Sequence, residues 1–123
     1  MGYMRHHAII VTTYDDKILA AAHKTAITIF GDEQVSDPIQ GKVNGYMSFL
    51  VGPDGSNEGW EPSDTGDARR KEFVVYLRAQ AYSDGSSSLK WVEVQYGDDE
   101  NQTEIVNDSD SDFVDHQAAH PEE

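Results

Sequence analysis

Residues 98–123 hold ten acidic residues and no lysine or arginine, so this stretch carries a net charge of −10. Residues 1–97 hold the other 13 acidic residues and all nine basic ones, which gives a net charge of −4. A segment with few apolar residues and one sign of charge buries too little surface to offset the entropy cost of folding. The pattern predicts a single folded domain over residues 1–97 and an acidic, flexible tail over residues 98–123.

Composition limits the class of domain and the chemistry that it can carry. Of the 123 residues, 37% are hydrophobic, which is enough for the core of one domain. The absence of cysteine excludes disulfides, thiolate nucleophiles and cysteine-ligated metals. The apolar runs are far shorter than the roughly 20 residues of a membrane span, and no signal peptide is visible. We therefore expect a cytoplasmic protein that does not bind membranes.

The first two predicted elements are a strand and a helix. Ala8 to Tyr14 is rich in β-branched residues and is apolar on both faces, as in a central strand that is covered on both sides. Asp15 and Asp16 suit the N-terminus of a helix that runs to Phe30, with a glycine directly after it. The helix carries one apolar stripe, which consists of Ile18, Ala22, Ala26, Ile29 and Phe30.

The next segments are predicted as a loop, a strand and a turn. Asp32 to Asn44 is polar and reads as a loop, whereas Gly45 to Val51 reads as a strand. The turn chemistry of "PDGS" follows, and Asn57 to Trp60 could form a short returning strand.

A second helix is expected after Ser63 or Asp64, either of which can cap it. The alternative is a strand over Glu72 to Tyr82, but the stretch is long and rich in good helix formers. The apolar face of the helix would consist of Phe73, Val74, Leu77 and Ala81.

The last predicted element of the domain is a strand over Leu89 to Tyr96, in which apolar and polar residues alternate. One face carries Val92, Val94 and Tyr96, and the wetter face carries Trp91, Glu93 and Gln95. We expect Trp91 on the exposed face, as part of a dimer surface or beneath the tail.

The element order predicts an α+β fold, a small two-layer sandwich with helices on one face of an antiparallel sheet. The expected arrangement is βαββαβ and ferredoxin-like. The third strand of that arrangement is short and polar here, so a three- or four-stranded variant is the alternative.

The stretch "GPDGSNEGWE" combines acidic residues, an amide, a serine and a tryptophan with a proline and three glycines. Its proline, glycines and Asp-Gly pair favour a hairpin turn. The alternative is a ligand loop in which Asp54 and Glu58 share a cation beside Trp60.

Other motifs predict no catalytic residue, no metal site and no cofactor. "HQAAH" spaces two histidines for one helix face but lacks the glutamate of a zinc protease. "DSDSD" begins like a calcium loop, but Phe113 stands where that loop needs glycine. Nucleotide-binding glycine motifs and serine-nucleophile motifs are absent from the sequence.

The phrases "GYMSFLVGPDGSNEGW", "GDARRKEFVVYL" and "DGSSSLKWVEVQYGDD" resemble a group of small acidic proteins of unassigned function that tailed bacteriophages encode. The resemblance covers about Arg5 to Asp99. It implies a protein made in the cytoplasm of an infected host cell, and it carries over no functional residue.

Charge and the lack of catalytic motifs favour a non-enzymatic binding protein that engages a basic host protein, as a DNA mimic or an inhibitor of host defence. The sparse basic residues argue against direct nucleic-acid binding. The predicted partner-binding residues are Asp108, Asp110, Asp112 and Phe113.

Three alternatives remain open from the sequence. The chain could be an accessory protein of the virion or its assembly, or an enzyme or ligand binder with a site at the Asp54 to Trp60 loop. A halophilic source would explain the acidity without a partner. The oligomeric state is not set by the sequence, and a homodimer is one alternative.

Overall fold

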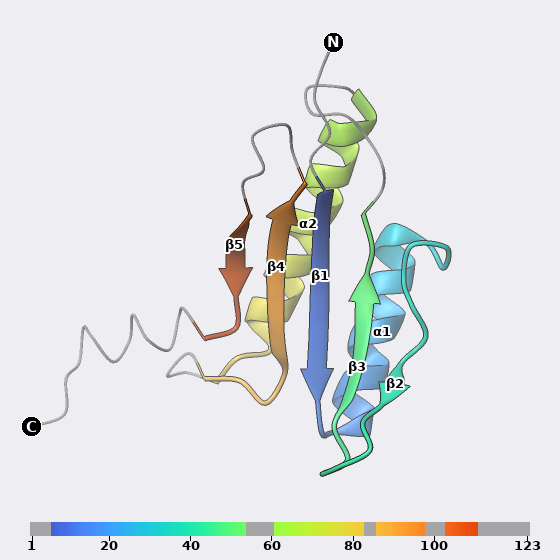
Figure 1. The fold of residues 1–123 in the computed structure, drawn as a ribbon, viewed down its shortest axis with the longest axis vertical. Coiled ribbons are helices and arrows are strands. Elements are labelled where there is room, and N and C mark those ends of the chain that lie inside the picture. Colours follow the sequence, from blue (N-terminus) through green and yellow to red (C-terminus); the bar gives the residue numbers. More distant parts are fainter. Residues whose placement is uncertain (1–5, 54–60, 83–85, 98–102, 111–123) are drawn as a thin grey trace, which may run out of the picture.

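The computed structural model describes residues 6–53, 61–82, 86–97 and 103–110, with side chains in the second range from residue 65 onward. It shows a five-stranded sheet with both helices on one of its faces, so the fold has two layers (Figure 1). The strands are β1 (His6–Thr13), β2 (Ile39–Gln40), β3 (Met47–Val51), β4 (Lys90–Tyr96) and β5 (Glu104–Asp108), and the helices are α1 (Asp16–Phe30) and α2 (Glu61–Ala79).

The sheet order is β2-β3-β1-β4-β5, and every neighbouring pair is antiparallel. β1 is central, as its β-branched sequence predicts. Because β3 and β4 are both antiparallel to β1, they run parallel to each other, and α2 connects them across β1. This is a split βαβ unit in which the first strand of the chain is the inserted strand.

The α+β class and the two-layer arrangement are confirmed, but the ferredoxin-like order is not. In a ferredoxin-like sheet, the strands on either side of the first helix are parallel and a third strand separates them. Here β1 and β3 are direct antiparallel neighbours. Residues 31–46 run back along the sheet after α1 and include β2, so the chain enters β3 in the opposite direction (Figure 1). The predicted strand over Asn57 to Trp60 lies outside the described residues.

Helix α1 begins and ends where its sequence predicts. The carboxylate of Asp15 accepts hydrogen bonds from the backbone N–H groups of Lys17 (3.0 Å) and Ile18 (3.2 Å), which the first turn cannot otherwise satisfy. At the other end, the N–H of Gly31 donates to the carbonyl of Ile27, and Gly31 has a φ of 88°. Glycine adopts this conformation without the steric cost of a side chain.

Replacing Asp15 with alanine is expected to lower the free energy of unfolding by about 1 kcal/mol, because two N–H groups of the first turn lose their acceptor. Asp15→Asn keeps an oxygen acceptor and should cost less. Urea denaturation of the two variants measures the difference, and equal losses would contradict the capping role.

The core lies between the sheet and the helices. β1 contributes Ile9 and Val11, and β3 contributes Phe49 and Val51. The helices contribute Leu19, Ala22, Ala26 and Phe30 from α1 and Phe73, Val74 and Leu77 from α2. The predicted apolar face of α2 is therefore confirmed at these three positions, whereas Ala81 lies beyond the helix end at Ala79.

The predicted exposure of Trp91 is wrong. Trp91 is buried in the core, and Glu93 on the same side of β4 is also buried. The valines of β4 lie on the opposite face, away from the helices, and are half-buried. The face of β4 that is more polar in the sequence is therefore the face that packs beneath α2.

The expectation of a flexible tail is wrong for Glu104–Asp108, which form β5 and pair with β4. The apolar pair in this segment contributes little to the pairing, because Ile105 is 63% exposed and Val106 is 44% exposed. β5 is attached through its backbone and its polar side chains. A search for apolar residues with a clear periodicity cannot detect such a strand.

Candidate protein-binding face

One face of the sheet has no helix over it in the described part of the chain (Figure 1). Successive side chains of a strand point to opposite faces, so Ile10 points away from the helices that bury Ile9 and Val11. Strand register then aligns Ile10 with Leu50 on one side and Val92 on the other. In the same way, Val94 is aligned with Ile105 of β5.

We call this surface the open face, and its apolar residues include Ala8, Ile10, Ile39, Leu50, Val92, Val94 and Ile105. Ile10 is 43% exposed and Leu50 is 39% exposed. The open face thus carries a contiguous apolar area over β3, β1, β4 and β5. A surface of this kind is typical of a protein interaction site.

A hollow of about 590 Å³ lies on the open face, beside the N-terminal end of β4 and the C-terminal end of β5. Ile10, Val92 and Ile105 contribute apolar surface to it, and Asp108 and Asp110 lie at its border. The Lys90 ammonium group donates a hydrogen bond to the Asp110 carboxylate (2.8 Å), which fixes one acidic residue beside the hollow. The backbone N–H of Asp110 donates to the Asp108 carboxylate (2.9 Å), which holds the turn in place.

On the covered face, a chain of polar contacts joins α2 to β4 and β5. Arg70 is almost fully buried and forms ion pairs with Asp67 and with Glu93, whose Oε2 lies 3.9 Å from the arginine Nε. Asn107 of β5 donates to Glu93 Oε1 (2.6 Å) and accepts a hydrogen bond from Arg78 (2.9 Å). We call Asp67, Arg70, Glu93, Asn107 and Arg78 the polar clamp.

The polar clamp also explains the basic cluster of α2. The sequence allows two interpretations of this cluster, a solvated helix face or a docking site for the acidic tail. Its members are Arg69, Arg70, Lys71 and Arg78. In the structure, Arg70 is buried against Glu93, and Arg78 contacts Asn107 and lies 5.9 Å from the centre of the Trp91 ring. The helix therefore does contact the segment that follows residue 97, through the side-chain amide of Asn107.

The predicted partner-binding residues fall into two groups. Asp108 and Asp110 border the hollow on the open face. Asp112 and Phe113 lie outside the described residues, and so do Asp54, Glu58 and Trp60 of the alternative ligand loop. Sequence reasoning missed Ile10, Leu50 and Lys90 as members of the same surface. The apolar residues on both faces of β1 were the available signal for the first of these.

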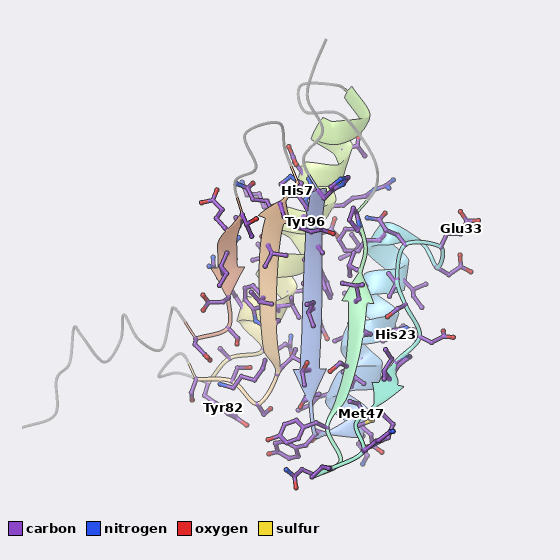
Figure 2. All side chains as sticks on the ribbon, viewed as in Figure 1. His7, His23, Glu33, Met47, Tyr82 and Tyr96 are labelled. Carbon is purple, nitrogen blue, oxygen red and sulfur yellow. The ribbon has the colours of Figure 1, made fainter. Side chains whose placement is uncertain are left out.

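The described histidines do not form one site. His7 and His23 lie far apart along the sheet (Figure 2), and His23 Nε2 is 2.9 Å from the carbonyl oxygen of Ser36. His6 packs against the ring of Tyr96 with a centroid distance of 5.5 Å. Within the described residues, no group of three histidines or acids is placed to hold a metal ion.

Comparisons with known proteins add no identity to this geometry. No family model, no curated protein and no solved structure matches the chain. Among the helices in the described part of the chain, neither combines the length and apolar character of a membrane span.

Proposed function

We propose that this protein is a non-enzymatic binding protein and that its open face docks a basic partner protein. The observation that carries the proposal is the mismatch between the sequence of β1 and its surroundings. β1 is apolar on both faces, which is typical of a strand buried on both sides, yet the helices cover only one side, and Ile10 on the other side is 43% exposed. A partner protein on the open face would provide the missing cover.

The charge of the chain supports a basic partner. Asp108 and Asp110 border the hollow, Glu104 lies on the same edge strand, and the whole chain carries a formal net charge of −14. A matching surface would present apolar side chains flanked by lysine or arginine. Charge complementarity of this kind increases the association rate and selects the partner. The inference that the partner is a host protein rests on the resemblance to phage proteins alone.

Replacing Ile10 and Leu50 with threonine is expected to weaken partner binding by about tenfold or more, since residues at the centre of an interface contribute most of the affinity. Threonine is β-branched, which suits a strand. The partner is captured from bacterial lysate with the full chain, identified, purified and then titrated against each variant by calorimetry.

The matched control is Val75→Thr, because Val75 is exposed on α2, on the other side of the sheet. We expect unchanged affinity for the control and weaker binding of the unchanged chain at high salt. Equal affinity for the control and the double variant would remove the open face as the docking surface. A chain that is a dimer by sedimentation, and a monomer after the double substitution, would show that a second copy covers the face instead.

A further inference from the structure

β5 is one of the two edge strands of the sheet, and it is the longer one. Its residues Glu104–Asp108 pair with β4 on one side, and no strand among the described residues pairs with the other side. The opposite edge strand, β2, has only two residues. An edge strand presents a row of N–H and C=O groups that can pair with another chain. Only β5 is long enough to align a partner strand.

We propose that the basic partner binds as an extended strand added to the outer edge of β5. This inference rests on the proposed function and adds the recognition mode: main-chain hydrogen bonds along β5 and side-chain contacts on the open face. Strand addition of this kind takes its affinity from backbone pairing and its specificity from alternate side chains.

The geometry of β5 fits this mode. Ile105 points to the open face, where its register partner is Val94. An added strand would lie about 4.8 Å from β5, and every second side chain would point to the same face. An apolar residue next to Ile105 would extend the contiguous apolar surface. The exposure of Ile105 and Val106 leaves room for such neighbours.

The acidic residues of β5 determine which kind of partner strand can pair with its outer edge. Glu104 and Asp108 lie at its two ends, and Asp110 follows closely. Because the register between β4 and β5 shifts between Glu93 and Val94, Glu104 is aligned with Gln95 and Asp108 with Val92, so the two carboxylates lie on opposite faces of the sheet. Like charges directly opposite each other destabilise a strand pair, whereas opposite charges stabilise it. The edge therefore favours a strand that places lysine or arginine beside Glu104 on one face and beside Asp108 on the other.

The polar clamp and two neighbouring contacts hold β5 on the sheet, so that its outer edge can align a partner strand. Asn107 lies between Glu93 and Arg78, the N–H of Ser109 donates to the carbonyl of Trp91 (2.9 Å), and Lys90 holds Asp110. These contacts join β5 to α2 and β4 on the side away from the free edge. A partner strand can pair with the outer edge without breaking them.

The probe is a fluorescein-labelled eight-residue peptide of alternating lysine and valine, titrated into the full chain and followed by fluorescence anisotropy. Two versions with N-methyl groups on alternate residues each remove the N–H groups of one peptide edge. We expect one version to bind at least about tenfold more weakly, because N-methylation removes several backbone hydrogen bonds. The other version should bind like the parent peptide. An alternating glutamate–valine peptide is expected not to bind.

Glu104→Gln with Asp108→Asn should weaken binding of the lysine–valine peptide by about three- to tenfold, because two charge pairs are lost. Asp32→Asn with Glu33→Gln removes the same charge after α1, far from β5, and should leave the affinity unchanged.

Three results would overturn strand addition. Equal binding of both N-methylated peptides, with sensitivity to Ile10→Thr retained, would leave the open face as the site but exclude backbone pairing. Loss of the backbone signals of Glu104–Asp108 from their strand positions in NMR spectra would show that the peptide displaces β5. Failure of the peptide to bind, while the purified partner still binds through Ile10 and Leu50, would exclude an extended ligand and keep the proposed function.

Discussion

Replacing Glu93 with leucine is expected to lower the free energy of unfolding by about 3 kcal/mol. Removing one partner of a buried ion pair typically costs about 3–5 kcal/mol, since the remaining charge has lost its water as well as its partner. Arg70 and Glu93 both have side chains less than one-tenth exposed. The loss should lie at the lower end of that range because Asp67 still contacts Arg70. Guanidinium denaturation, monitored by circular dichroism, measures the loss in free energy of unfolding.

The matched variant combines Glu93→Leu with Arg70→Met, so that both charges are replaced by apolar side chains. Such replacements of a whole buried pair are often neutral or stabilising. Most of the stability lost in Glu93→Leu should therefore return, apart from about 1 kcal/mol for the acceptor that Asn107 loses. A double variant as unstable as the single one would show that shape at this position matters, and not the unpaired charge.

The same ion pair explains why the orientation of β4 could not be predicted from its sequence. In isolation, a strand with valines on one side and glutamate on the other places its valines in the core. Burial of Glu93 becomes favourable because Arg70 reaches it from α2, 23 positions earlier in the chain, and because Asn107 of β5 donates a hydrogen bond to it. A charge pair between distant elements leaves no local pattern. The same contact places Trp91 in the core and turns Val92 and Val94 to the open face.

β5 shows a second limit of sequence reasoning. Its flanking acids and scarce apolar residues satisfy the criteria for disorder. Strand pairing, however, depends on backbone groups and on a few polar contacts, of which the Asn107 contact with Glu93 and Arg78 is the clearest. Composition predicts whether a segment can form its own core. It does not predict whether an existing sheet edge will accept that segment as a further strand.

Local signals predicted the helices and the central strand correctly. Asp15 and Gly31 define the ends of α1 through side-chain capping and backbone conformation, and both effects act within a few residues. The choice of helix over strand for Glu72 to Tyr82 was also correct as far as Ala79. On the candidate site, the sequence predicted Asp108 and Asp110, but it could not bring Ile10 beside them, because strand order sets that proximity.

Replacing Phe73 with alanine is expected to lower the free energy of unfolding by about 3–5 kcal/mol, the usual cost of truncating a fully buried aromatic residue. Phe73 is 0% exposed and lies at the centre of an aromatic cluster that joins both helices to the sheet. Its ring centre is 5.7 Å from that of Phe30 on α1, 6.5 Å from that of Phe49 on β3 and 6.0 Å from that of Tyr76. Alanine removes the ring that all three of these rings contact, and the close-packed surroundings fill the resulting cavity only in part.

Val75→Ala is the matched control for Phe73→Ala, since Val75 lies two residues away on α2 with its side chain 61% exposed. Substitutions at exposed positions of this kind usually change stability by no more than about 0.5 kcal/mol. Thermal and urea denaturation should therefore separate the two variants by several kcal/mol. A Phe73→Ala variant within about 1 kcal/mol of the control would mean that α2 does not depend on the aromatic cluster.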